Sequence, residues 1–276
     1  MNSLLAKKND LVGILRQLES VVVAYSGGVD STLLLKVCQD TLGNERVLAV
    51  TAISETYPSE EVQAATRLAR SLGARHRLIT TAELGNPRFA ANPPDRCYHC
   101  KSELFGKLKE IAVQEGLRHV VDGANRDDLA DHRPGRRAGR ELGVQSPLQE
   151  AGLTKDEIRA LSRELGLPTW NKPPFACLAS RLPYGTVITK EALAQVDQAE
   201  GFLRQLGVGQ LRVRHHGTIA RIEVEPGDFP FLIARENRER VVARFKEIGY
   251  LYVTLDLTGY RTGSMNEVLQ GEKRAT

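Results

Sequence analysis

Cysteine is scarce in this sequence: four stand in 276 residues. That number is too small for a disulfide-rich secreted framework, so closely spaced thiols are expected to bind a metal or do chemistry. Long hydrophobic runs are missing too, and no charged-then-apolar leader opens the chain. These absences predict a cytoplasmic protein without a membrane partner.

An excess of charge of one sign is also lacking. The 38 Lys and Arg residues against 34 Asp and Glu give a net charge of +4, which is modest for a nucleic-acid-binding protein. The densest basic run, RPGRRAGR at 133–140, suits a phosphate-bearing small molecule as well as a nucleic acid. Nucleic acid is therefore not the expected partner.

Apolar runs that alternate with helical patterns fill the first part of the chain. The runs VVVAY, RVLAVTA, RHRLIT and HVVDG predict strands at 21–25, 46–52, 75–80 and 119–123. Leucines at helical spacing, with glycines as stop signals, predict helices between them, one of which follows the pair Cys97 and Cys100. Such units predict an α/β fold with a parallel, twisted sheet and ligands at the carboxyl ends of its strands.

The pattern changes after about Gly185. A helix is followed by LRVRHH and IARIEVE, which alternate polar and apolar residues as exposed antiparallel strands do. We therefore predict a large α/β domain at 1–185 and a smaller C-terminal α+β domain at 186–276, which would serve substrate binding and oligomerisation.

The strongest chemical signal is the stretch AYSGGVDSTLLL between a predicted strand and helix. Gly27 and Gly28 let the backbone come close to a ligand, and the first amides of the helix favour an anion. Ser26 and Ser31 offer hydroxyl donors, and Asp30 is suited to orient the loop or to hold Mg²⁺. The pattern is not a Walker loop. A plain turn capped by Ser31 is the simpler alternative.

SGGVDS resembles the PP-loop of the N-type ATP pyrophosphatases, which cleave ATP between the α and β phosphates and adenylate a substrate oxygen. This likeness covers about residues 20–130 and implies the adenine nucleotide α-hydrolase-like fold, ATP and Mg²⁺. Further stretches occur in the same order and spacing as in one family of that group: DGANRDD, DHRPGRRAG, SPLQEAGLTKDEIRALSRELGLPTWNKPPFACLASRLPYGT and YVTLDLTGYRTGSMN. Over essentially the whole chain they resemble the LarE family, the ATP-dependent pyridinium-3,5-biscarboxylic acid mononucleotide sulfurtransferases of nickel-pincer nucleotide biosynthesis.

The resemblance implies an enzyme that activates a pyridinium carboxylate as an acyl adenylate and replaces AMP with sulfur, giving a thiocarboxylate. It implies a nucleotide substrate, sulfide or another sulfur donor, and a homo-oligomer. Without the resemblance, the residues predict only that an acceptor is adenylated and that sulfur is added to it.

The cysteines leave several readings open from the residues alone. Cys38 falls in an apolar helix and is expected to be a buried small side chain. Cys97 and Cys100 could form a redox disulfide. They could instead hold a structural zinc ion together with Cys177 and His99. Or the three cysteines could hold a 4Fe–4S cluster. Cys177, after Pro-Pro, is expected on a loop near the sheet edge.

The family resemblance then ranks these alternatives. One form of the family has a lone cysteine that matches Cys177 and gives up its own sulfur in a single turnover. The other form has two more cysteines, matching Cys97 and Cys100, and is implied to hold a 4Fe–4S cluster that delivers sulfur repeatedly. This chain has the second pattern, so the cluster is favoured over zinc, and zinc over a redox pair. Sacrificial donation from Cys177 stays an alternative.

The resemblance also suggests roles for several charged residues. Asp30 is expected to be catalytic, as are the three cysteines. Asp122, Asp127 and Asp128 are expected to contact Mg²⁺ or the ribose of ATP. A substrate phosphate would be held by arginines, namely Arg181, Arg212, Arg214 and Arg261. A divalent ion is loosely expected among Glu200, Glu223 and Asp228. Helix caps, loop salt bridges and a solvated strand face are the simpler alternatives for these positions.

Three other function classes remain. A tRNA-thiolating PP-loop enzyme would bind RNA tightly at low salt, although no appended RNA-binding domain is recognisable. An ammonia-dependent ligase of the NAD synthetase kind would not need the three cysteines. A nucleotide-binding scaffold with structural zinc would bind ATP without releasing pyrophosphate.

Overall fold

The computed structural model describes residues 3–129, 134–174, 176–261 and 263–264. The chain divides into two compact units, the first made of Met1–Phe89 with Asp95–Phe175 and the second of Ala90–Pro94 with Ala176–Thr276. The second unit thus begins before residue 186, where the sequence pattern changes, and it also takes in a short segment from far upstream.

Hydrogen bonds explain why that upstream segment belongs to the second unit. The buried side-chain amide of Asn92 donates to the carbonyls of Leu182 at 3.3 Å and Pro183 at 2.7 Å. The amide of Ile188 donates to the carbonyl of Ala90 at 2.8 Å. Buried polar groups need such partners, but the pairs are about ninety residues apart in the chain, and no local pattern announces them.

A four-stranded parallel sheet forms the centre of the first unit, as predicted. Its strand order is β3-β2-β1-β4. The strands are β1 (Val21–Ala24), β2 (Val47–Ile53), β3 (His76–Thr80) and β4 (His119–Val121). The helices of this part of the chain are α1 (Ser3–Leu18), α2 (Val29–Leu42), α3 (Ser59–Ser71), α4 (Pro87–Ala90), α5 (Arg96–Gln114), α6 (Gly135–Glu141), α7 (Pro147–Glu150) and α8 (Lys155–Glu164).

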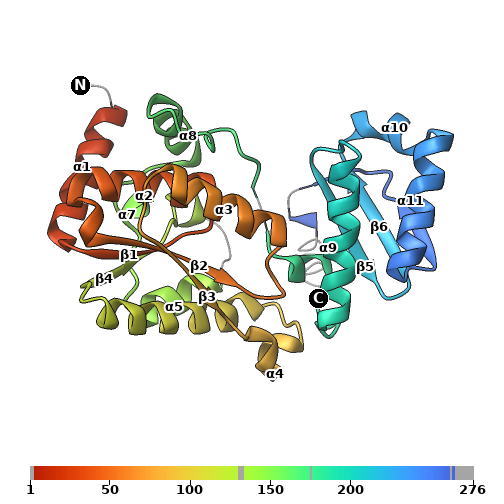
Figure 1. Ribbon diagram of the computed structural model, residues 1–276, viewed down its shortest axis with the longest axis horizontal. Coiled ribbons are helices and arrows are strands. Elements are labelled where there is room, and N and C mark those ends of the chain that lie inside the picture. The colour runs from red at the N-terminus through yellow and green to blue at the C-terminus, as the bar shows by residue number, and fades with distance from the viewer. Residues whose placement is uncertain (1–2, 130–133, 175, 262, 265–276) are drawn as a thin grey trace, which may run out of the picture. The chain divides into compact units, whose positions relative to one another are not determined.

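Helices cover both faces of this sheet. Figure 1 shows α1, α2 and α3 on one side of the strands and α5 on the other. Successive side chains of a strand point to opposite faces, so Val21 and Val23 pack with Leu33 of α2, whereas Val22 packs with Phe105 of α5. Burial on both faces is the reason that these strands read as continuous apolar runs.

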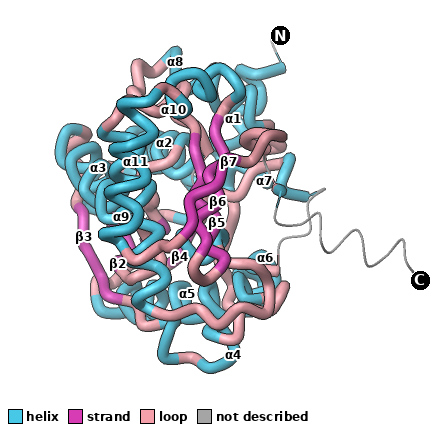
Figure 2. The backbone as a smooth tube through the Cα atoms, turned by 90° about the vertical axis from the view of Figure 1, so that its right-hand side faces the viewer, coloured by secondary structure: helices cyan, strands magenta, loops and turns pink. Residues whose placement is uncertain are grey.

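The second unit is a smaller α+β structure, also as predicted. Its elements are α9 (Lys190–Gln205), β5 (Leu211–His216), β6 (Ile219–Val224), α10 (Phe229–Ile233), α11 (Arg235–Ile248) and β7 (Tyr252–Leu255). Strands lie side by side in the order β5-β6-β7, with β5 and β6 antiparallel and β6 and β7 parallel (Figure 2). The hydrophobic core of this unit joins α9 and α11 to the sheet.

One expectation about this sheet is wrong. The alternation in LRVRHH predicted an exposed strand face, but five of the six residues of β5 are buried, including Arg212 and Arg214. Leu211 and Val213 point into the core, and the arginines on the other face are covered by protein instead of water. Among the described helices, none has both the length and the apolar character that crossing a membrane requires.

Candidate functional site

The glycine-rich loop, residues 26–31, links the end of β1 to α2. Because β1 lies between β2 and β4, the strand order reverses here, which is where such sheets bind ligands. Gly28 is the N-cap of α2 and no side chain caps that helix, so the first helical amides are not engaged by a capping side chain. The hydroxyl oxygens of Ser26 and Ser31 lie 3.1 Å apart within the loop. This arrangement suits a phosphate-bearing ligand.

Two neighbouring segments press on this loop so closely that glycine is needed at each contact. A Cβ on Gly27, which has φ +68°, would lie 2.7 Å from the Cβ of Ala65 on α3. A Cβ on Gly123, after β4, would lie 3.1 Å from the amide nitrogen of Ser31 and 3.2 Å from the Cβ of Asp30. The loop is therefore held between α3 and the segment that follows β4.

Asp30 is fixed from two directions. Its Oδ1 accepts a hydrogen bond of 3.3 Å from the side-chain amide of Asn125, in the segment after β4. Its Oδ2 forms an ion pair with the ammonium group of Lys155 on α8. Both side chains of that ion pair keep partial exposure, 22% for Asp30 and 33% for Lys155. Asp30 thus ties together three segments while its charge stays close to the first turn of α2.

The aspartates after β4 mainly shape that segment. Asp122 Oδ1 accepts from the Ser146 hydroxyl at 2.7 Å, and the buried Asp128 accepts from the amide of Asn125 at 3.0 Å. Exposed Asp127 accepts from the amide of Lys155 at 2.8 Å, and so caps the start of α8. Loop hydrogen bonds and a helix cap, the simpler alternatives, are thus present at all three positions. A role of Asp122 and Asp127 in ATP binding stays a prediction.

Two lysines beside the loop were missed by sequence reasoning. Besides Lys155, the ammonium group of Lys172 donates to the carbonyl of Gly27 at 3.1 Å and pairs with Glu61 of α3 at 2.7 Å. The only local signal was the capping box of Thr154 and Glu157, which marks the start of α8 and so locates Lys155 at a helix end. The contact between Lys155 and Asp30 joins residues 125 positions apart, so no local sequence pattern predicts it.

The cysteine pair lies inside a helix and not ahead of one. Helix α5 begins at Arg96, so Cys97 and Cys100 occupy its first turns. Side chains three residues apart on a helix share a face. Cys97 is exposed, and Cys100 is half-buried with its Sγ 3.9 Å from the hydroxyl of Tyr57. Both thiols are therefore presented on one side of α5, in the first unit.

Helix α6, which carries most of the basic run, packs against the same end of α5. A Cβ on Gly135 would lie 2.9 Å from Cγ of Lys101 and 3.3 Å from the carbonyl oxygen of Cys97. The guanidinium of Arg137 lies 3.8 Å from the centre of the Tyr98 ring. From residue 135 onward the basic run is thus an ordered helix; Arg133 lies outside the described residues.

The remaining two cysteines, Cys38 and Cys177, differ in burial and belong to different units. Cys38 is completely buried in the core of the first unit, as predicted, and burial raises the pKa of its thiol. Cys177 is half-buried and belongs to the second unit, where it precedes the short 3-10 turn Leu178–Arg181. The prediction that Cys177 joins Cys97 and Cys100 around one metal group stays a prediction.

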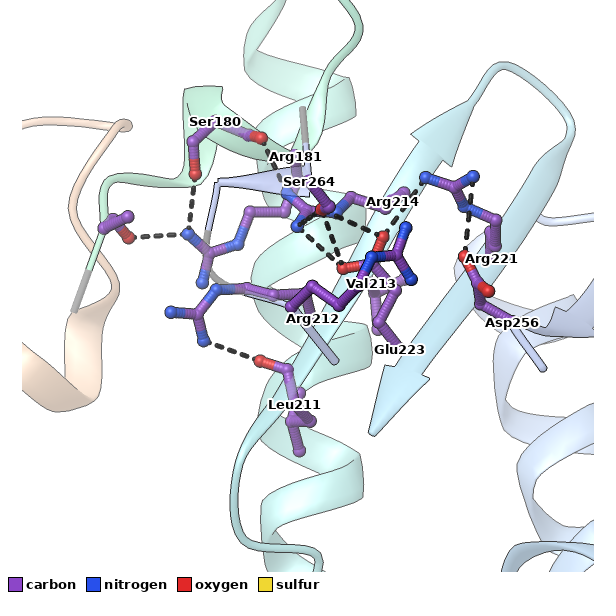
Figure 3. Close-up of polar contacts among 12 residues, drawn as sticks. Ser180, Arg181, Leu211, Arg212, Val213, Arg214, Arg221, Glu223, Asp256 and Ser264 are labelled. Atoms are coloured by element: carbon purple, nitrogen blue, oxygen red, sulfur yellow. Dashed lines mark hydrogen bonds and ion pairs between the residues drawn. The ribbon is translucent and has the colours of Figure 1, made fainter. Parts of the chain in front are cut away.

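Two of the arginines predicted to bind a phosphate, Arg181 and Arg214, already donate hydrogen bonds to carboxylates and carbonyls of the protein. Arg181 is fully buried and forms two parallel bonds of 2.8 Å to the carboxylate of Glu200. Arg214 donates to Glu223 at 2.7 Å and to the carbonyl of Ser180 at 2.9 Å. Figure 3 shows the guanidinium groups of Arg181, Arg212 and Arg214 close together beside β5 and β6. Burial with carboxylates takes up donors that a phosphate would need.

The hydrogen bonds described for Arg212 and Arg261 run to main-chain carbonyls, and each arginine also interacts electrostatically with a carboxylate, Glu200 for Arg212 and Asp256 for Arg261. Arg212 donates to the carbonyl of Leu211 at 2.6 Å and lies 5.2 Å from the Tyr260 ring centre. Burial, followed by the positive charge of Arg181, lowers the pKa of Arg212 to about 10. Arg261 donates to the carbonyl of Gly259 at 3.4 Å. A role of Arg212 and Arg261 in binding a substrate phosphate stays a prediction.

The divalent-ion group expected among Glu200, Glu223 and Asp228 stays a prediction, and the positions of these residues lend it no support. In the described part of the second unit no three His, Cys, Asp or Glu side chains are placed to hold a metal ion. Glu200 and Glu223 lie completely buried among arginines, and Asp228 instead precedes α10. Burial would raise the pKa of Glu200, but Arg181 and Arg204 outweigh it, so the pKa is lowered. Both carboxylates are therefore engaged in ion pairs with arginines.

Comparison with known proteins finds one family model that matches the first part of the chain and several relatives that match nearly all of it. The family model of NAD synthase matches residues 12–88, which hold the glycine-rich loop. An uncharacterized protein of Synechocystis sp. is 46% identical over 264 residues, covering 96% of this chain and 98% of its own. An uncharacterized protein of Methanocaldococcus jannaschii is 30% identical, covering 95% of this chain and 98% of its own.

The pyridinium-3,5-bisthiocarboxylic acid mononucleotide synthase of Lactiplantibacillus plantarum is 43% identical over 279 residues, covering 100% of this chain and 99% of its own. The likeness therefore extends through the glycine-rich loop, the Cys177 turn and the second unit alike. The chain belongs to the LarE family, the ATP-dependent sulfur-insertion enzymes of the PP-loop superfamily.

Proposed function

We propose that this protein inserts sulfur into pyridinium-3,5-biscarboxylic acid mononucleotide through a carboxyl adenylate, giving the thiocarboxylates of the nickel-pincer nucleotide. The observation that carries the proposal is the full-length likeness to the synthase of that bisthiocarboxylic acid mononucleotide. The glycine-rich loop and the three accessible cysteines supply the two halves of the chemistry, activation and sulfur donation.

Adenylation is needed because a carboxylate is a poor electrophile. A substrate carboxylate oxygen attacks the α-phosphorus of ATP, and pyrophosphate leaves with the electron pair of the broken bond. The amides at the start of α2 and the hydroxyls of Ser26 and Ser31 would hold the phosphates. Lys155 and Lys172 bring positive charge to the same loop, where it would stabilise the departing pyrophosphate.

Mg²⁺ would accompany ATP at this loop. Carboxylates are the ligands that it prefers in proteins; Asp30 lies in the loop, and Asp127 lies in the segment after β4 that contacts it. When bound, the ion would neutralise charge on the phosphates. Lys155 contacts both carboxylates, since its ammonium group pairs with Asp30 and its amide donates to Asp127. It therefore links the positions of the two side chains.

The cysteines suit a sulfur-donating cluster. Cys97 and Cys100 share one face of α5, Cys97 is exposed, and Cys177 is accessible in part. Three thiolates would hold three irons of a 4Fe–4S cluster. When bound, such a cluster would supply sulfide to the activated carboxyl carbon and could be reloaded between turnovers. The protein's part is to hold the adenylate, exclude water and let AMP leave.

Sacrificial donation is the alternative. The Cys177 thiolate would attack the activated carbonyl and expel AMP, and loss of its Cα proton would then break the Cβ–Sγ bond. The product would keep the sulfur and Cys177 would become dehydroalanine. This route needs neither Cys97 nor Cys100.

A phosphate of the substrate would lie in the second unit near Arg212. Burial and the charges of Arg181 and Arg214 lower the pKa of Arg212, and Glu200 and Tyr260 partly offset them. An anion placed beside Arg212 would add to that offset. Arg261 would be the second contact. Arg181 and Arg214 are engaged with Glu200 and Glu223 and would act on the phosphate only through their charge.

The test is iron and acid-labile sulfide content of protein purified without oxygen, with the variants Cys97→Ala, Cys100→Ala and Cys177→Ala. We expect about four irons per chain, lost in each of the three variants and kept in Cys38→Ala, the buried control. Pyrophosphate release that depends on the dicarboxylate nucleotide tests the adenylation step.

The outcomes separate the alternatives. Zinc without iron would refute the cluster, and metal-free protein whose Cys177 loses sulfur mass after one turnover would establish the sacrificial route. Pyrophosphate release that does not need the nucleotide would refute the substrate. We also expect a homo-oligomer, which light scattering on the eluting protein would measure.

A further inference from the structure

The turn that carries Cys177 has its main chain pinned on one side. The carbonyl of Cys177 accepts from the amide of Ser180 at 3.0 Å, the hydroxyl of Ser180 at 2.8 Å and Nη1 of Arg181 at 2.9 Å. The same Nη1 donates to the carbonyl of Ala176 at 2.6 Å. Two successive carbonyls are thus gathered on one guanidinium group, while the Cys177 side chain keeps partial exposure.

That guanidinium group is itself immobilised. Nε and Nη2 of Arg181 each donate to Glu200 at 2.8 Å, and both side chains have no exposed surface. Glu200 in turn accepts from the amide of Val213 on β5 at 3.0 Å, so the pair is attached to the sheet. A planar fork that meets a carboxylate with two bonds allows little rotation.

A second buried ion pair holds the other end of the turn. Nη1 of Arg214 donates to the carbonyl of Ser180 at 2.9 Å, and Nη2 donates to Glu223 and to the hydroxyl of Ser264, each at 2.7 Å (Figure 3). Arg214 lies on β5 and Glu223 on β6. The two ion pairs therefore anchor three carbonyls of the turn to one sheet.

We propose that Arg181 and Arg214, through Glu200 and Glu223, are positioning residues that fix the direction in which Cys177 presents its sulfur. The inference rests on the proposed role of Cys177 in sulfur transfer. Both a metal ligand and a sacrificial nucleophile must meet their partner atom within a fraction of an ångström. A side chain on a short turn acquires such precision only if the main chain beneath it is held.

The test substitutes Arg181→Lys, because lysine keeps the charge beside Glu200 but has no fork to reach two carbonyls and two carboxylate oxygens together. The matched control is Arg204→Gln, which removes an ion pair at 2.7 Å to the same Glu200 within α9. In Arg181→Lys we expect amide hydrogen exchange at Ser180 to rise at least about tenfold, because that amide donates to the Cys177 carbonyl.

Activity gives a second readout that a merely structural role would not move. In Arg181→Lys, kcat for sulfur transfer should fall between about 10- and 100-fold, while the KM for ATP and nucleotide-dependent pyrophosphate release stay within twofold. Arg204→Gln should match the wild type in all three quantities. Exchange at Ser180 and a kcat both unchanged in Arg181→Lys would overturn the proposal, as would an equal loss in Arg204→Gln.

Failure of the proposed function gives a different result. If Cys177→Ala kept full sulfur transfer, the function assigned to Cys177 would fall, and the positioning role would fall with it. If Cys177→Ala abolished transfer while Arg181→Lys loosened the turn and kept kcat, only the positioning inference would be refuted. Should Arg181→Lys not fold, Ser180→Ala, which removes one of the three donors to the Cys177 carbonyl, would carry the same measurements.

Discussion

Replacing Gly27 with alanine should damage the glycine-rich loop by two separable effects. The first is conformational, because Gly27 has φ +68° and the left-handed region costs an L-residue about 1–2 kcal/mol. The second is steric, because the new Cβ would lie 2.7 Å from Cβ and 2.8 Å from Cα of Ala65. Overpacking of this kind typically costs about 1–3 kcal/mol. Together the two lower the free energy of unfolding by about 2–5 kcal/mol.

Gly73→Ala is the matched control for this experiment. Gly73 has a similar φ, +64°, but no atom lies within 4 Å of where its Cβ would be. The control should therefore lose only the conformational part, about 1–2 kcal/mol, and keep wild-type pyrophosphate release. The difference between the two variants measures the contact with α3.

The assays are urea unfolding and pyrophosphate release. Relief of the clash by moving the loop would spare stability but misplace the phosphate-binding amides, so Gly27→Ala should lose at least about tenfold in pyrophosphate release. Adding Ala65→Gly to Gly27→Ala should restore activity only in part, since Cα of residue 65 stays at 2.8 Å. A Gly27→Ala protein with the stability and activity of Gly73→Ala would refute the reasoning.

Two further predictions concern charges. Lys155→Met should slow pyrophosphate release but change the free energy of unfolding by less than about 1 kcal/mol, because the ion pair of Lys155 with Asp30 is partly exposed. The control Lys8→Met breaks another partly exposed ion pair and should leave pyrophosphate release unchanged. Equal rates of release in the two variants would count against a role of Lys155 at the loop. Despite burial, which would raise it, the pKa of Glu200 lies below 4.5 through Arg181 and Arg204. A lowered folded pKa gives stability that is complete above about 4.5 and lost as the pH falls, so acid unfolding should be less steep in Arg181→Gln; an unchanged pH slope would contradict this.

Local sequence signals were sufficient where burial acts on a continuous stretch. The four parallel strands lie within the predicted ranges or one residue beyond them, because strands buried on both faces must be apolar along their length. The loop of Ser26, Gly27 and Gly28 was likewise readable, since its glycines and its place before a helix are properties of adjacent residues.

Local signals failed where distant packing stabilises the element. The first turn of α5, with Cys97 and Cys100, carries no apolar periodicity and was predicted to precede the helix. It is stabilised by α6, which Gly135 allows to approach Lys101 closely, and by the stacking of Arg137 on Tyr98. The parallel pairing of β6 with β7 was missed for the same reason.

The sequence by itself thus determined the parallel sheet, the glycine-rich loop, the isolation of Cys38 and the family. Only the tertiary structure decided what the charged residues do. Arginine is almost never buried without a partner, and the partners of Arg181 and Arg214 stand 19 and 9 residues away, on α9 and β6. Folding brings these glutamates to the arginines. Two of the four arginines predicted to hold a phosphate, Arg181 and Arg214, thereby donate hydrogen bonds to the main chain of the Cys177 turn.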